Sequence, residues 1–296
     1  MGEGHPECPQ RLAAIEDHLI STGLDIALER REAGPATLRD VEHAHSTGYV
    51  TELCEVLEGV AASGRSRAID PDTVACPATL RAALAAAGAA VAATDAVLDG
   101  DISNAFCAVR PPGHHATRGA AMGFCFFNNV AIAARHALDV RGLQRVAIID
   151  FDVHHGNGTE DIIAGDERVL MVSFFQHPLY PYSGDVPKAS NMVNLPIPPY
   201  TRGPAIRALI ETHWMPRLND FRPEMVFISA GFDAHRDDEL GQLGLVEADY
   251  AWITQRIVDL AARHAKGRIV SCLEGGYNLS ALARSVAAHL RVLAGV

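Results

Sequence analysis

Residues 145–159 have the sequence RVAIIDFDVHHGNGT. The first part is β-branched and continuously apolar, which is the pattern of a strand buried on both faces of a parallel sheet. The second part is polar and glycine-rich, and it begins where such a strand should end. Asp152 and His154 stand one residue apart there, so an extended chain points both side chains to the same face. The stretch therefore predicts a buried parallel strand with a polar site at its carboxyl end.

Other apolar, strand-like runs alternate with longer helical segments along the chain. The predicted strands are 104–109, 145–151, 168–174, 192–196, 224–230 and 267–273. The predicted helices are 9–21, 48–60, 77–98, 128–140, 204–218, 246–264 and 279–293. This alternation predicts an α/β fold with a predominantly parallel central sheet and helices on both faces. We find no repeat, linker or charge block, so we expect one domain over residues 1–296.

The composition is that of a globular protein. The chain has 296 residues, of which 48% are hydrophobic and 21% charged, and this excludes a disordered chain. The net charge of −11 argues against nucleic acid or an anionic membrane as a partner. The most apolar stretch, 82–98, is broken by Thr94 and Asp95, which favours a core helix over a membrane span. Cysteines without a CxxC pair and an N-terminus without signal-peptide character predict a cytoplasmic protein.

Four predicted strands run into polar, glycine-rich motifs. These motifs are RPPGHH (110–115), DFDVHHGN (150–157), GFDAH (231–235) and EGGYN (274–278). The carboxyl ends of parallel strands lie at one edge of a sheet, where open α/β proteins bind their ligands. We therefore expect titratable side chains from four distant segments to share one pocket.

Asp152, His154 and Asp233 form a candidate metal site at this edge. Two carboxylates and one imidazole leave a coordination position open, which is the arrangement of catalytic rather than structural zinc. The alternative interpretation is that these are strand-end acids that cap helices or bind water. Because two carboxylates neutralise a divalent cation, its bound water needs a neighbouring base, and the tandem His114–His115 can supply one.

Each of the two tandem histidines needs a partner for its second ring nitrogen. Asp150 and Asn157 flank the metal motif and are the candidates. A carboxylate stabilises imidazolium more than an amide does, so we expect the two histidines to titrate differently. Tyr277 follows two glycines, which let the backbone approach the pocket closely. Its hydroxyl could stabilise a developing oxyanion, although a core or loop tyrosine is the alternative interpretation.

Together these motifs resemble the histone deacetylase family, which includes acetylpolyamine amidohydrolases and acetoin-utilisation proteins. The matching stretches, in the family's order, are HPECPQRL (5–12), RPPGHHA (110–116), GFCFFNNVAIAA (123–134), IDFDVHHGNGT (149–159), SAGFDAH (229–235) and LEGGYN (273–278). They span nearly the whole chain, and Asn157 is similar to the residue of the class II branch. The resemblance implies the arginase/deacetylase fold, a single domain around an eight-stranded parallel sheet.

The resemblance also implies a role for each candidate residue. One Zn²⁺ is held by Asp152, His154 and Asp233. The catalytic set is His115 as general base and then acid beside Asn157, His114 paired with Asp150, and Tyr277 as donor to the substrate carbonyl. The substrate-binding set is Gly123, Phe124, Tyr180, Leu240, Gly275 and Gly276, and Arg11 lines an acetate-exit channel. A structural K⁺ is bound by Asp150, Ser173 and backbone oxygens of Asp152, His154 and Phe174, and a second K⁺ by Ile163, Asp166 and Val169.

The implied activity is zinc-dependent removal of acetyl or related acyl groups from amines. The expected partners are an acylated lysine peptide or protein, or an acetylated polyamine, and the sequence leaves the oligomeric state open. An arginase-like binuclear manganese hydrolase needs a carboxylate four residues after Asp152, where this chain has Gly156. A catalytically inactive acyl-lysine binder should lack His115, Tyr277 or a metal ligand, and all are present.

Two features depart from the family pattern. Members usually carry a short strand before the HPE motif, so we expect either that this edge strand and part of the pocket rim are missing or that translation starts upstream of Met1. The acetylpolyamine-selective homologue has a glutamate at the position of Leu240, whereas here Glu239 stands beside that position. We therefore expect an apolar rim with an acid nearby.

Overall fold

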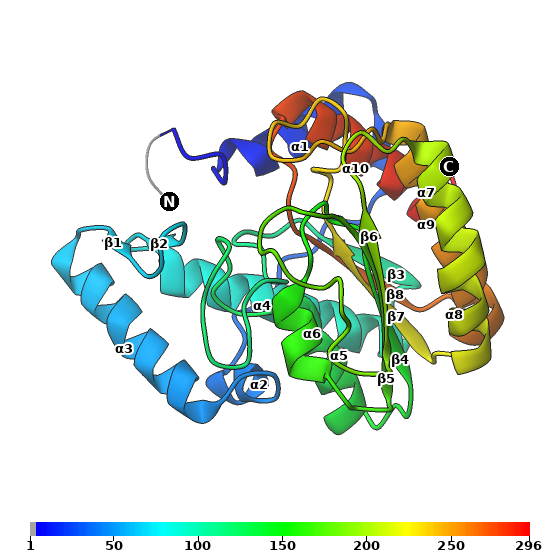
Figure 1. The fold of residues 1–296 in the computed structure, drawn as a ribbon. Helices are drawn as coiled ribbons and strands as arrows, with labels where there is room; N and C mark the ends of the chain where they lie inside the picture. Colours follow the sequence, from blue (N-terminus) through cyan, green and yellow to red (C-terminus); the bar gives the residue numbers. More distant parts are fainter. Residues whose placement is uncertain (1–3) are drawn as a thin grey trace.

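The central sheet has six parallel strands in the order β3-β8-β7-β4-β5-β6 (Figure 1). The computed structural model describes residues 4–296. The strands are β3 (Asn104–Cys107), β4 (Val146–Asp150), β5 (Val169–Gln176), β6 (Met192–Ile197), β7 (Met225–Ala230) and β8 (Ile269–Leu273). Each lies within or largely overlaps a strand predicted from an apolar run, and every pair is parallel. The predicted α/β fold is confirmed.

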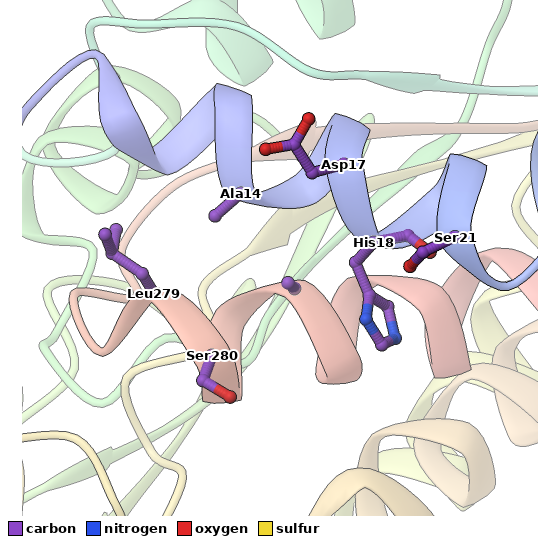
Figure 2. A pocket seen from close by; sticks show the side chains of 7 residues that line it. Ala14, Asp17, His18, Ser21, Leu279 and Ser280 are labelled. Carbon is purple, nitrogen blue, oxygen red and sulfur yellow. The ribbon is translucent and has the colours of Figure 1, made fainter.

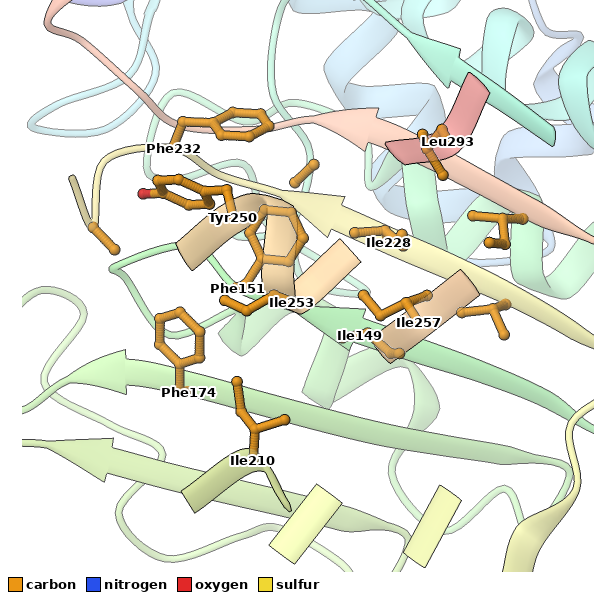
Figure 3. Close-up of a cluster of buried hydrophobic side chains, with 14 of the residues drawn as sticks. Ile149, Phe151, Phe174, Ile210, Ile228, Phe232, Tyr250, Ile253, Ile257 and Leu293 are labelled. Atoms are coloured by element: carbon orange, nitrogen blue, oxygen red, sulfur yellow. The ribbon is translucent and has the colours of Figure 1, made fainter. Parts of the chain in front are cut away.

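Alternate residues of each central strand face opposite layers of helices. In β4, Ile149 packs in the core on one face and Ile148 in the core on the other. The first face is covered by α1 (Gln10–Ser21), α7 (Gly203–Leu209), α8 (Met215–Phe221), α9 (Glu247–His264) and α10 (Leu279–Ala294). The second is covered by α3 (Thr47–Ser63), α4 (Thr79–Asp99) and α5 (Asn129–Asp139). Figure 3 shows the first core, where Phe151, Phe174 and Phe232 gather near the carboxyl ends of the strands.

Helix α4 is long and apolar enough to cross a membrane by length and composition alone. Ala83, Ala87 and Ala90 are nevertheless buried in the core beneath the sheet, where α4 packs on α5. Gly88 packs so closely on residues 34–36 that a Cβ there would overlap their backbone. The small residues thus serve close helix packing, as expected for a core helix.

The expectation of an eight-stranded central sheet is wrong for the described residues. Two further strands, β1 (Arg67–Ala68) and β2 (Val74–Ala75), pair only with each other in an antiparallel ribbon. Each has two residues, and those of β1 are exposed. A strand covered on both faces needs a continuous apolar run, and neither segment has one.

Three short helical segments were not expected from the sequence. These are η1 (Leu24–Ala27), α2 (Leu38–Glu42) and α6 (Asn157–Ile163). Glycines at 156 and 158 make the start of α6 a poor helix by propensity. Tertiary contacts hold it instead, because the N–H groups of Gly158 and Thr159 donate to the carbonyl of His114. The predicted helix 204–218 is found as α7 and α8 joined by a π-helical segment, η2 (Ile210–Trp214).

Candidate active site

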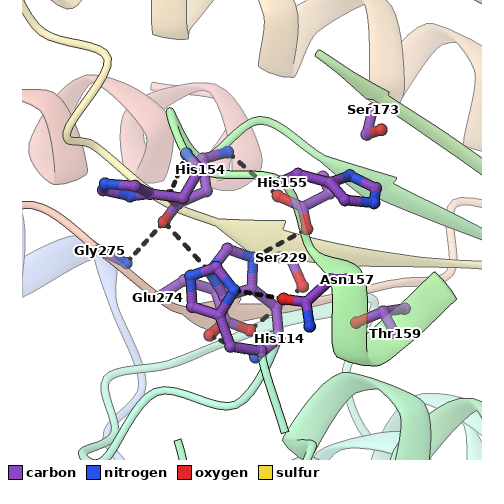
Figure 4. A network of polar contacts seen from close by, with 12 residues as sticks. His114, His154, His155, Asn157, Thr159, Ser173, Ser229, Glu274 and Gly275 are labelled. Atoms are coloured by element: carbon purple, nitrogen blue, oxygen red, sulfur yellow. Dashed lines mark hydrogen bonds and ion pairs between the residues drawn. The ribbon is translucent and has the colours of Figure 1, made fainter. Parts of the chain in front are cut away.

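The strand-end motifs meet at one edge of the sheet, as the sequence predicted (Figure 4). Asp152 and His154 follow β4, and Asp233 follows β7. One ligand atom from each of these residues lies within 4.8 Å of the other two. Nδ1 of His154 lies 3.1 Å from Oδ1 of Asp152 and 3.2 Å from Oδ2 of Asp233. The structure therefore brings the three predicted metal ligands together around one point.

Two glycines make room for the ligand carboxylates. A Cβ on Gly231 would overlap the carboxylate of Asp152, and one on Gly275 would overlap that of Asp233. The N–H of Gly275 donates to Oδ2 of Asp152 at 2.9 Å, and the N–H of Val153 donates to Oδ1 of Asp233 at 2.9 Å. The backbone thus orients both carboxylates directly.

The electrostatics of these three groups fit a bound cation. Asp152 and Asp233 are both fully buried, so their negative charges are poorly screened. Burial and the charge of Asp152 raise the pKa of Asp233 to about 7. Burial opposes a charge on His154, yet the two carboxylates raise its pKa to about 10. A positive charge is therefore favoured at this point, and two carboxylates with one imidazole suit a divalent ion such as zinc.

The two tandem histidines have the different partners that the sequence predicted. Nδ1 of His114 lies 3.0 Å from Oδ2 of Asp150, whereas Nδ1 of His115 lies 2.8 Å from Oδ1 of Asn157. Burial alone would lower the pKa of His114, but the neighbouring carboxylates raise it well above its usual value. Burial and the charges of the neighbouring histidines lower the pKa of His115 well below its usual value. The pKa values of the two histidines thus shift in opposite directions, in keeping with their different partners.

The partner of His115 sets its tautomer. Nδ2 of Asn157 lies 3.3 Å from the sulfur of Met122, which leaves Oδ1 to face the imidazole as an acceptor. Nδ1 of His115 therefore carries the proton, and Nε2 has a free lone pair. The rings of His115 and His154 are 6.0 Å apart, so this acceptor lies next to the candidate metal ligands.

Aromatic side chains form walls beside His115 and Tyr277. The ring of Tyr180 stands edge-on to His115 at 5.2 Å, and Phe124 stands edge-on to Tyr277 at 6.0 Å. A Cβ on Gly123 would overlap the ring of His115, so only glycine fits there. Burial raises the pKa of Tyr277 well above its usual value, which keeps its hydroxyl protonated as a donor.

Carboxylates outside the predicted set fasten these walls. Oδ1 of Asp238 accepts the N–H of Leu240 at 3.0 Å, and its Oδ2 accepts the N–H of Tyr277 at 2.6 Å. Asp72, beside β2, accepts the N–H of Gly123 at 3.1 Å. Neither aspartate can be predicted from the sequence, because a side chain that bonds to distant backbone leaves no spacing pattern. Leu240 is half-buried and the neighbouring glutamate is exposed, as expected for the rim.

Arg11 is fully buried beneath Tyr277. Its Nε donates to the carbonyl of Gly276 at 2.7 Å, and its guanidinium carbon lies 5.0 Å from the centre of the Tyr277 ring. One terminal nitrogen lies 3.5 Å from Glu7 and makes no hydrogen bond within the part of the chain that the structure describes. A cationic donor thus remains available under the site.

The first predicted potassium site offers only oxygen atoms. Asp150 and Ser173 are register partners on β4 and β5, and Phe174 follows directly. The carbonyls of Asp152 and His154 accept no backbone N–H from residues 4–296. Carboxylate, hydroxyl and free carbonyl oxygens together suit a hard cation.

The second predicted potassium site is arranged differently. The carbonyls of Ile163, Asp166 and Val169 all accept from Nδ2 of Asn191, at 3.0, 3.2 and 3.0 Å. Oδ1 of Asn191 accepts the N–H of Gly165 at 3.1 Å, which fixes the orientation of the amide. An amide nitrogen therefore stands where an ion would contact the three carbonyls. These residues as arranged do not fit a potassium ion.

A separate open hollow of about 360 Å³ lies between α1 and α10 (Figure 2). Ala14, His18 and Leu279 are among its lining residues. It contains none of the predicted site residues.

Comparisons with known proteins agree with this fold. A family model described as the histone deacetylase domain matches residues 5–293. A probable deacetylase of Archaeoglobus fulgidus is 39% identical over 284 residues, which cover 93% of this chain and 77% of that protein. Polyamine deacetylase HDAC10 of Mus musculus is 39% identical over 308 residues, which cover 98% of this chain and 45% of that protein. The crystal structure of the HDA15 HD domain matches with a TM-score of 0.91 and 33% identity, covering 100% of this chain and 83% of that chain.

The parallel sheet with helices on both faces and the site at its carboxyl edge define the arginase/deacetylase fold. Within that fold, the chain belongs to the histone deacetylase family.

Proposed function

We propose that this protein is a zinc-dependent deacetylase in which residues 1–296 form one catalytic domain. The observation that carries the proposal is the meeting of Asp152, His154 and Asp233 beside His115, whose Nε2 is free to accept a proton. The names of the relatives, a probable deacetylase and a polyamine deacetylase, support amide hydrolysis of an acylated amine. We expect a cytoplasmic protein that binds neither nucleic acid nor membrane.

One Zn²⁺ per chain is the proposed catalytic ion, held by the three residues named above. Bound there, it would polarise the substrate carbonyl and make a water molecule more acidic. A single structural K⁺ is proposed at Asp150, Ser173 and Phe174, because these residues offer the ion only oxygen ligands. The arrangement of Asn191 argues against a second one.

The protein residues then carry the proton transfers. Nε2 of His115 accepts a proton from the attacking water, while Asn157 holds the ring in the required tautomer. The hydroxyl of Tyr277 donates to the oxygen of the carbonyl as negative charge develops on it. His115 then returns the proton to the nitrogen of the leaving amine, and His114 remains paired with Asp150.

The walls and the channel define the proposed path of the substrate. Tyr180 lies beside His115 and Phe124 beside Tyr277, and the two rings fit the extended apolar part of an acylated lysine or polyamine. Leu240 would form the rim, and Gly123, Gly275 and Gly276 let the backbone approach the substrate. The free guanidinium nitrogen of Arg11 would meet the released acetate.

Hydrolysis of an acetyl-lysine peptide and of N-acetylputrescine, measured side by side with zinc-loaded protein, tests the proposal. Tyr277→Phe serves as the control for background activity. Turnover of the peptide alone supports a protein deacylase, and preference for the polyamine supports the small-molecule alternative. Turnover of neither substrate, with zinc bound, would contradict deacetylation of these amines.

A further inference from the structure

Glu274 is a fully buried carboxyl group that the proposed reaction does not use. It is the first residue after β8, and its side chain reaches the loop that carries the two catalytic histidines (Figure 4). Oε2 accepts the N–H of Gly113 at 2.6 Å and the N–H of His114 at 3.1 Å. Oε1 accepts a hydrogen bond from the hydroxyl of Ser229, near the carboxyl end of strand β7, at 3.1 Å. Glu274 thus ties the histidine loop to the sheet.

The backbone of His114 is held on both sides. Its N–H bonds to Glu274, and its carbonyl accepts the N–H groups of Gly158 and Thr159 at 3.0 and 3.1 Å, in the first turn of α6. The preceding Gly113 packs against the start of α5, where a Cβ would overlap the backbone of residue 129. Steric contact and hydrogen bonds therefore limit the movement of this loop.

Both catalytic hydrogen bonds depend on the position of this backbone. His114 reaches Asp150 at 3.0 Å, and His115 reaches Asn157 at 2.8 Å. A shift of about 1 Å would take both contacts out of hydrogen-bond range. Misplacement on that scale can slow a reaction roughly 100-fold.

We propose that Glu274 is a positioning residue, which holds the backbone of Gly113 and His114 so that both histidines meet their partners. The expected loss of kcat rests on the proposed function. The placement of the loop by Glu274 does not, because the protection of the N–H groups of Gly113 and His114 from hydrogen exchange can be measured without substrate.

Three substitutions separate positioning from simple burial. In Glu274→Gln, Oε1 can still accept both N–H groups and the amide can donate to Ser229, so the loop should stay in place. Glu274→Met removes every acceptor with little change in volume and leaves two buried N–H groups unpaired. Ser229→Ala is the matched control, because it removes one bond to Glu274 without touching the loop.

The test measures amide hydrogen exchange in residues 111–116 together with kcat and KM, on zinc-loaded proteins of equal metal content. Glu274→Met should exchange faster in this loop and lose roughly 100-fold in kcat with little change in KM. Glu274→Gln and Ser229→Ala should keep the protection and stay within about 5-fold of the native kcat. If Glu274→Met does not fold, Glu274→Asp, which withdraws the acceptor by one methylene, takes its place.

Unchanged exchange in Glu274→Met, or equal impairment of the Gln and Met variants, would overturn the positioning role. A native protein that hydrolyses no acylated amine would instead overturn the proposed function. In that case the exchange data alone would decide the role of Glu274.

Discussion

Nδ1 of His115 and Oδ1 of Asn157 lie 2.8 Å apart, and this bond determines which ring nitrogen of the proposed base is free. The amide oxygen accepts a hydrogen bond from the ring N–H without adding a charge. Burial and neighbouring charges therefore keep the pKa of His115 low, and the ring stays neutral. The choice of an amide over a carboxylate has a measurable consequence.

Asn157→Asp should shift the acidic limb of the kcat/KM profile to higher pH. A carboxylate beside His115 stabilises its protonated form, so the pKa of the base rises and less of it is free at neutral pH. The pH profile of the variant on its best substrate provides the measurement. Met122→Leu is the control, because it removes the other contact of Asn157 without adding charge. An unshifted limb would exclude His115 as the titrating base.

Tyr277→Phe should lower kcat by about 10²–10³-fold and change KM little. The phenol is expected to donate only as negative charge develops on the carbonyl oxygen, and loss of one such donor has an effect of this size. Steady-state kinetics with matched zinc content would measure it. Turnover close to the native rate would remove the tyrosine from the mechanism.

Metal removal should abolish activity and lower the melting temperature. Without an ion, Asp152 and Asp233 hold charge in a buried space, which disfavours the folded state. An ion present at 100 times its Kd stabilises the fold by about 2.7 kcal/mol, and that contribution disappears with a chelator. Elemental analysis should give one zinc per chain, and zinc should restore activity. Two manganese ions per chain would favour a binuclear centre instead.

Asn191→Ala should destabilise the protein by about 1–3 kcal/mol, because three carbonyls lose their common donor. The native chain should bind one K⁺. The Asn191→Ala variant should be more stable in potassium chloride than in choline chloride, because K⁺ can then bind the three carbonyls. Thermal unfolding in both salts, with elemental analysis, measures the effect. Two potassium ions in the native protein would contradict this account.

His289 should make the fold less stable as the pH falls. Its Nδ1 contacts Thr254 at 2.7 Å and its Nε2 contacts Ser271 at 3.0 Å, and burial lowers its pKa to about 3. The unfolded chain takes up a proton near pH 6.5, whereas the folded chain does not until about pH 3. Stability from this group is therefore lost between these values, at about 1.4 kcal/mol per pH unit.

Chemical unfolding of native protein and His289→Gln at pH 5.0–6.5 would measure this slope. The variant should show the smaller dependence on pH, although it is less stable overall. Parallel curves would mean that another group carries the effect.

The sequence predicted the elements whose burial needs continuous apolar runs. The six strands and the helices that cover them carry such patterns. The polar motifs that follow the strands hold the candidate metal ligands and histidines at one edge of the sheet. The two-residue strand β1 escaped prediction because it is too short to show a pattern, and α6 escaped because contacts from the distant residue His114 hold it. Asp238 and Glu274 escaped because they bind backbone N–H groups, which any residue can supply. The expectation of eight strands in the central sheet was wrong because it came from the family resemblance, whereas the apolar runs indicate six.

Glycine main chain lies directly against several of the reactive groups of this site. Gly231 and Gly275 face the ligand carboxylates and Gly123 faces the ring of His115, each without room for a methyl group. Directed evolution of this protein should therefore yield no active variants substituted at these three glycines, since any new side chain would displace a reacting group. Changes in substrate preference would have to come from Phe124, Tyr180 and Leu240, whose side chains line the proposed substrate path but neither bind the metal nor move a proton. The three glycine positions should therefore tolerate no substitution, whereas the wall residues should tolerate several.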